Sequence, residues 1–307
     1  MHLFELTQIE RAKYGGSVPD WALGCFRRRS ITYYVGQLDE TTRVLWLQSR
    51  GLTADFRLPP AVPRVAREEL GTLDLTALIQ LCRVEGGFSR TRWDGELMHW
   101  SDWVSFQTHA KWPEPGHLRR VGDCLIEFAP SGAYVEDWRL QPSDPGPLIG
   151  LSLIEERDLE RQTLRHLGGG LIVCGEHAAF VRGRPRALPE GRLVEYAGKI
   201  ASNAAELAAV FGFDASYARA ADDAAGFRVT LSTLPWRLEQ PLLELEGFSY
   251  DPARDLVLQR TVEDGISIER LFRIDTLEPT FVATAATVAN ADARSWFDRE
   301  RDELLVP

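Results

Sequence analysis

The stretch VLWLQSRGLTADFRLP, residues 44–59, indicates the class of fold because it alternates apolar and polar side chains around an Arg50-Gly51 turn. Successive side chains of a β-strand point to opposite faces, so the stretch predicts two neighbouring strands. The apolar face of the second strand consists of Ala54, Phe56 and Leu58. The mixed polar and aromatic faces of the two strands carry Trp46, Gln48, Asp55 and Arg57.

Similar short runs recur between turn signals throughout the first half of the chain. The runs that read as strands are residues 27–35, 42–48, 52–58, 96–109, 118–128 and 133–140. This spacing is typical of an antiparallel sandwich or barrel and not of alternating strands and helices. One helix is expected between residues 62 and 83, where Leu75, Leu78, Ile79 and Cys82 share a face.

The run LQPSDPGPLIG, residues 140–150, contains three prolines and predicts a domain boundary. We therefore divide the chain into domains of residues 1–145 and 146–307. In the second half, residues 168–185 predict two strands joined at Gly175, and further strands are expected at residues 226–232, 242–249, 255–262 and 266–274. Helices are expected at residues 190–211 and 291–304, so the sequence predicts two tandem antiparallel β-barrels, each with an accessory helix.

Length, composition and charge narrow the class of protein. A chain of 307 residues with 44% hydrophobic and 26% charged residues fits two globular domains. Its net charge of −10 argues against nucleic acids and anionic membranes as partners, since phosphates are bound by an excess of Lys and Arg. The start of the chain does not resemble a signal peptide, and no run approaches the roughly 20 apolar residues that cross a bilayer. We expect a cytoplasmic protein.

Several familiar chemical motifs are missing. The cysteines, expected to be reduced and mostly buried, are scattered as Cys25, Cys82, Cys124 and Cys174. The glycines of residues 168–170 lead into a strand and not a helix, which argues against a phosphate-binding loop. His99, His109 and His117 fit no compact metal-binding spacing. We expect neither a metal nor a cofactor.

Aromatic and titratable side chains are concentrated in HWSDWVSFQTHAKW, residues 99–112. If this stretch is a strand, one face carries Trp103, Ser105, Gln107 and His109, and the other carries Trp100, Asp102, Val104 and Phe106. In AYVEDWRL, residues 133–140, one face carries Tyr134, Glu136 and Trp138. If these strands and the stretch at 44–59 close into one sheet, their polar and aromatic faces line a common cavity.

Short blocks of the sequence resemble a family of two-domain, lipocalin-like proteins. The blocks are Trp46-Leu47-Gln48, residues 55–59, the tryptophan-rich stretch, residues 134–138 and residues 170–175. The family includes a casein-kinase-interacting protein of yeast and uncharacterised bacterial relatives. The resemblance implies two calycin-type barrels in tandem, and it supplies no set of catalytic residues.

The first functional hypothesis is a cofactor-independent enzyme of the lyase or isomerase type, acting on a small apolar or aromatic molecule in the N-terminal barrel. His109 would be the general acid or base, since an imidazole titrates near neutral pH, with Glu136 or Asp55 as its partner or as a second acid or base. The expected ligand-binding residues are Trp46, Gln48, Arg57, Trp103, Gln107, Tyr134 and Trp138.

Two alternatives use the same residues differently. A non-catalytic binding protein would hold the same ligand without turning it over. A protein-interaction module, as the yeast relative suggests, would expose the tryptophans as a patch. For the second half we expect a scaffold or the contact of a homodimer, because Cys174 beside His177 reads more simply as a buried structural cysteine than as a nucleophile.

Overall fold

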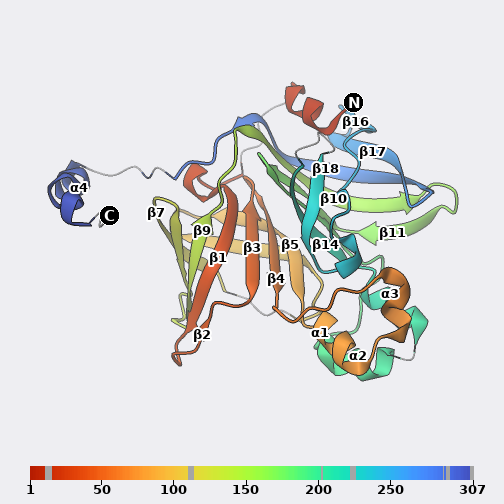
Figure 1. Ribbon diagram of the computed structural model, residues 1–307. Helices are drawn as coiled ribbons and strands as arrows, with labels where there is room; N and C mark the ends of the chain where they lie inside the picture. Colours follow the sequence, from red (N-terminus) through yellow and green to blue (C-terminus); the bar gives the residue numbers. More distant parts are fainter. Residues whose placement is uncertain are drawn as a thin grey trace.

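The computed structural model describes residues 1–10, 16–109, 114–201, 203–221, 226–285, 287 and 291–304. Two antiparallel sheets of nine strands each make up most of this structure, which confirms the predicted mainly β class. Figure 1 shows the first sheet rolled into a barrel at the lower left and the second sheet crossing above it on the right.

The first sheet is a closed barrel, as the sequence predicts for the first half. Its strands are β1 (Gly24–Tyr33), β2 (Leu38–Asp39), β3 (Arg43–Gln48), β4 (Leu52–Leu58), β5 (Glu85–Trp93), β6 (Leu97–Ser105), β7 (Gly116–Val121), β8 (Cys124–Phe128) and β9 (Tyr134–Leu140). They pair in chain order from β3 to β9, and β1 pairs with both β3 and β9, which closes the ring; β2 pairs only with β1. The expected hairpin is β3–β4, whereas β5 was not predicted and residues 118–128 form two strands.

The second sheet is open, so the predicted second barrel is not confirmed. Its strands are β10 (Gly146–Asp158), β11 (Thr163–Leu167), β12 (Gly169–Cys174), β13 (His177–Arg182), β14 (Asp214–Ala220), β15 (Phe227–Ser232), β16 (Phe248–Asp251), β17 (Leu256–Glu263) and β18 (Ile266–Phe281). The order is β15-β14-β13-β12-β10-β18-β17-β16, and no pairing among the described residues joins β15 to β16. The long strand β10 pairs with β12 along its first part and with β11 along its last.

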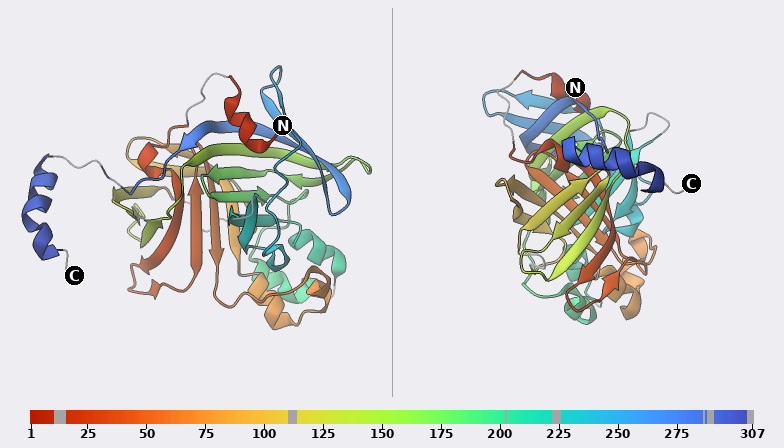
Figure 2. Two further views of the ribbon diagram at one scale, coloured as in Figure 1. Left: turned by 45° about the horizontal axis from the view of Figure 1, so that its top comes forward. Right: turned by 90° about the vertical axis from the view of Figure 1, so that its left-hand side faces the viewer.

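Four helices and four short 3-10 helices complete the described part of the fold. They are α1 (Leu75–Leu81), α2 (Leu193–Ile200), α3 (Ala204–Val210), α4 (Ala291–Leu304), η1 (Leu3–Gln8), η2 (Asp20–Ala22), η3 (Arg67–Thr72) and η4 (Pro235–Arg237). The helices α1 and α4 lie where the sequence predicts them. The expected single helix at 190–211 is two helices, because the Asn203 side chain accepts hydrogen bonds from the first turn of α3 and starts a new helix. Helix α4 stands away from both sheets (Figure 2).

The barrel and the second sheet share one hydrophobic core. Ala54 and Phe56, on the outward face of β4, belong to the same buried cluster as Val181 and Tyr217 of the second sheet. The rings of Phe56 and Tyr217 are 6.4 Å apart. The opposite face of the second sheet is covered by η1, whose Leu3 is buried there. Because β4 buries its apolar face outside the barrel, its polar face points inward.

The run at residues 140–150 is only partly a linker, since β9 ends at Leu140 and β10 begins at Gly146. The turn between β3 and β4 is tied to β18: the Asp275 carboxylate accepts hydrogen bonds from Ser49 Oγ and from the Gly51 amide, both at 3.1 Å. None of the helices in the described residues has the length and apolar character that a membrane span requires.

Candidate functional site

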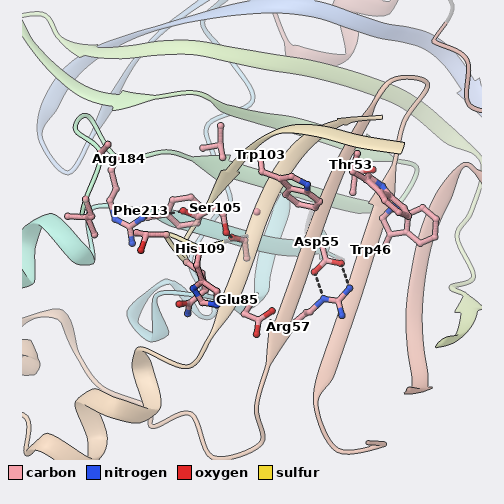
Figure 3. A pocket seen from close by; sticks show the side chains of 18 of the residues that line it. Trp46, Thr53, Asp55, Arg57, Glu85, Trp103, Ser105, His109, Arg184 and Phe213 are labelled. Carbon is pink, nitrogen blue, oxygen red and sulfur yellow. Dashed lines mark hydrogen bonds and ion pairs between the residues drawn. The ribbon is translucent and has the colours of Figure 1, made fainter. Parts of the chain in front are cut away.

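A cavity of about 570 Å³ lies inside the barrel and extends to the loop that follows β13. Strands β3 to β6, β8 and β9 contribute its walls. Figure 3 shows Trp46, Asp55 and Arg57 on one side of it and Arg184 and Phe213 on the other, with Ser105 and His109 between them. A cavity of this size that combines aromatic walls with a few polar groups is the usual form of a small-molecule site.

Eight of the ten residues expected at the site line this one cavity. They are Trp46, Asp55, Arg57, Trp103, Gln107, His109, Tyr134 and Trp138. The closed barrel brings them together because alternate side chains of every strand point to its interior. Gln48 and Glu136 are the two that do not reach the cavity surface.

Gln48 positions Trp46 instead of contacting a ligand. The Trp46 Nε1 donates to Gln48 Oε1 at 3.0 Å, and Gln48 Nε2 donates to the carbonyls of Ser49 at 2.8 Å and Leu52 at 3.0 Å. Gln48 is fully buried in the hairpin. It therefore fixes the indole ring of Trp46 against the cavity wall.

Glu136 and Asp55 belong to a row of alternating charges. Arg28 Nη1 is 2.6 Å from Glu136 Oε1, and Arg57 Nη1 is 3.1 Å from the same oxygen. Arg57 Nε also pairs with Asp55 Oδ1 at 2.9 Å, and Arg28 Nη2 pairs with Asp39 at 3.0 Å. Burial raises the pKa of Asp55, while the charge of Arg57 opposes that rise. These carboxylates are held by arginines before any ligand enters.

His109 lines the cavity just beyond the end of β6. Its Nδ1 atom is buried and has no hydrogen-bond partner within the described residues. In that same part of the chain no hydrogen bond joins His109 to Asp55 or Glu136, so the expected partnership with these carboxylates is absent. Gln107 Nε2 donates to the carbonyls of Cys82 at 2.9 Å and Val84 at 2.7 Å, which anchors the segment that carries His109.

A β-bulge changes which tryptophans reach the cavity. Strict alternation places Trp100 and Trp103 on opposite faces of β6, but both line the cavity. The β5–β6 register shifts beside Ser89, and Asp102 has a φ of 53°, so one extra residue is accommodated. Trp112, the last aromatic residue of the predicted stretch, lies outside the described residues.

Glu127 of β8 is the functional candidate that the sequence reading missed. It is buried and lines the cavity. Tyr134 Oη donates to Glu127 Oε1 and Trp138 Nε1 donates to Glu127 Oε2, each at 3.1 Å. Burial, reinforced by the negative charge of Glu136, raises the pKa of Glu127 to about 8. Its only signal in the sequence is a carboxylate on the same strand face as the apolar Leu125.

Cys174, expected to be a structural cysteine, is buried, as is His177. Burial raises the pKa of Cys174 well above its usual value, and His177 is held by Tyr217 Oη at 2.7 Å and by the Pro142 carbonyl at 2.9 Å. This arrangement supports a structural cysteine. Within the described ranges, no three His, Cys, Asp or Glu side chains group in a way that could hold a metal ion.

No protein-family model matches the chain, and no curated protein sequence matches it significantly. The crystal structure of an uncharacterized protein from Saccharomyces cerevisiae is similar, with a TM-score of 0.44 and 11% sequence identity, over 83% of this chain and 98% of that one. This similarity assigns neither a family nor an activity to the chain.

Proposed function

We propose that the protein is a cofactor-independent enzyme of the lyase or isomerase type, which transfers protons to or from a small apolar or aromatic molecule held in the barrel cavity. The observation that carries this proposal is Glu127. A buried carboxyl with a pKa of about 8 is a protonated acid at neutral pH, and a strongly shifted group in a cavity is typical of a functional site. It costs stability to keep such a group in the interior, and a purely structural role would be served by a neutral amide.

The chemistry assigned to the site is general acid–base catalysis. Glu127 would donate or accept the proton, because a group whose pKa lies near the working pH does both efficiently. His109, which also lines the cavity and whose Nδ1 is without a partner among the described residues, would be the second acid or base. Trp46, Trp100 and Trp138 would stack against the ligand and exclude water.

A non-catalytic binding protein is the second candidate. The observation that favours it is the full pairing of Asp55 and Glu136 with arginines, which leaves fewer groups for chemistry. In this case Glu127 and His109 would contribute to affinity alone.

We also propose a lipocalin-like, calycin-type relationship for the barrel. Its support is the order of its eight ring strands, each antiparallel to its neighbour in the chain, which is the up-and-down pattern of that class.

The test is a titration of wild type, Glu127→Gln and His109→Ala with small aromatic and polyketide-like compounds. Tryptophan fluorescence reports binding, and chromatography with NMR reports chemical change, isomerisation included. We expect Glu127→Gln to keep its affinity within a few-fold and to lose about 100-fold or more in turnover. Glu40→Gln, an exposed glutamate, is the control. If the wild type binds a compound without turning it over, the enzyme proposal is contradicted and the binding protein is supported. No binding of any compound would contradict both candidates.

A further inference from the structure

Arg184 lies at the end of the cavity away from Arg57 (Figure 3). Its guanidinium donates three hydrogen bonds to main-chain carbonyls: Nε to Val210 at 2.9 Å, Nη1 to Ser105 at 3.2 Å and Nη2 to Phe106 at 2.9 Å. A guanidinium has five N–H groups, so two remain beyond these bonds. All three acceptors are neutral.

No carboxylate neutralises this cation within the described part of the chain. Instead, the rings of Phe106 and Phe213 lie 5.1 and 5.3 Å from the guanidinium carbon. Burial lowers the pKa of Arg184 to about 10, so the side chain is still charged at neutral pH. A charge in such surroundings is costly unless an opposite charge meets it.

Arg186, two residues after Arg184 in the chain, also lines the cavity. It is exposed, and the described residues offer it neither an ion pair nor a hydrogen bond. Within the described residues, Arg184 and Arg186 therefore give the loop that follows β13 an unneutralised positive charge at the cavity.

The other charged groups of the cavity are differently placed. Arg57 is matched by Asp55 and Glu136, so it offers little net charge to a ligand. Glu114 is bound to Ser131, with its oxygens 2.7 Å from the hydroxyl and 3.1 Å from the amide. Glu85 adds a further carboxylate to the wall. An anionic ligand group is thus favoured at Arg184 and Arg186 and disfavoured elsewhere.

We infer that the ligand of this cavity is a carboxylic acid with an apolar or aromatic body, and that Arg184 and Arg186 bind its carboxylate. The inference rests on the proposed function, because it assumes that the cavity holds a small molecule. With the carboxylate at this end, the body of the ligand lies among the tryptophans and points toward Glu127. Arginine suits the task because its planar donors match a carboxylate in pairs.

Naphthalene-1-acetate and naphthalene-1-acetamide test the inference, since they share a ring system and differ in charge. Isothermal titration should show the acid binding at least 10-fold more tightly than the amide to the wild type. Arg186→Gln should weaken the acid about fivefold and change the amide by less than twofold. Arg184→Lys keeps the charge but not the fork of donors, and should also narrow the preference for the acid.

Arg254→Gln is the matched control. It removes the same charge as Arg186→Gln, but Arg254 is exposed in the turn between β16 and β17. It should leave both affinities unchanged. Equal binding of acid and amide to the wild type, or equal weakening of both by Arg186→Gln, would overturn the inference and leave the proposed cavity function intact. If neither compound binds the wild type, the proposed function fails together with the inference.

Discussion

Glu127 carries a cost that depends on pH. The pKa of this carboxyl is about 8 in the folded protein, against 4.5 as its ordinary value. Between these pH values the unfolded chain releases the proton while the native state keeps it. The free energy of unfolding therefore falls as pH rises from about 4.5 to 8, and is constant above that range.

Glu127→Gln removes this cost while keeping the shape of the side chain. We expect urea unfolding to show the variant more stable than the wild type at pH 8.5, by on the order of 3 kcal/mol. At pH 4 the two proteins should agree closely, because the wild-type carboxyl is then protonated in both states. Glu40→Gln, on the surface, should show no such difference. A variant less stable than the wild type at pH 8.5 would contradict the shifted pKa.

Neighbouring residues of the site differ in how far the sequence could predict them. Alternation placed Tyr134, Glu136 and Trp138 on one face, and all three are buried on it. The partners of Glu136 could not be predicted, because Arg28 is 108 positions away in the sequence and Arg57 is 79 positions away. Which residues share a strand face follows from local geometry, whereas ion pairs follow from the closure of the barrel.

Strand β5 is a whole element that the sequence did not predict, because its glycines are explained by contacts between distant parts of the chain. Its sequence, EGGFSRTRW, begins with glycines that usually indicate a turn. A Cβ atom on Gly86 would lie 3.0 Å from Ala215 Cβ, in β14 of the second sheet, and 2.7 Å from Cγ2 of Thr233, the residue that follows β15. The close contact between the two sheets requires glycine at this position. Because this contact involves residues far away in the sequence, the local pattern of residues 85–93 does not reveal the strand.

Gly86→Ala should therefore destabilise the protein by about 1–3 kcal/mol in chemical denaturation, because it overpacks the contact between β5 and the second sheet. Thr233→Ser removes the obstructing methyl and keeps the hydroxyl that is 3.0 Å from the Ala215 amide. The double variant should recover part of the loss. Gly71→Ala, where a Cβ atom would meet nothing within 4 Å, is the control. Additive losses in the double variant would contradict the proposed steric cause.

The second sheet is held together by charges that are far apart in the sequence. Arg270 is fully buried and forms ion pairs with Glu156 at 2.8 Å and with Glu263 at 2.7 Å. Arg182 forms ion pairs with Glu263 at 2.6 Å and with Asp214 at 2.7 Å. These residues come from β10, β13, β14, β17 and β18. The network was not predictable, since Glu156 and Arg270 are 114 positions apart. Nearby cations lower the pKa of Glu156 to about 2.

Because the barrel and the second sheet share a core, loss of this network should unfold both together. Arg270→Met leaves the buried Glu156 with a missing partner, and should cost about 3–5 kcal/mol at pH 7. This difference in the free energy of unfolding should shrink as pH falls from about 4.5 toward 2. In that range the carboxylates of the wild-type network take up protons, so the wild type loses the stability that its ion pairs provide. Unfolding would be followed by circular dichroism and by tryptophan fluorescence, in which the buried residues Trp46 and Trp138 report on the barrel.

Arg260→Met is the control. It breaks the more exposed ion pair between Arg260 of β17 and Glu269 of β18, and should cost about 1 kcal/mol or less. If fluorescence kept the wild-type midpoint while circular dichroism shifted, the barrel would be stable without the second sheet, and the shared core would not couple them.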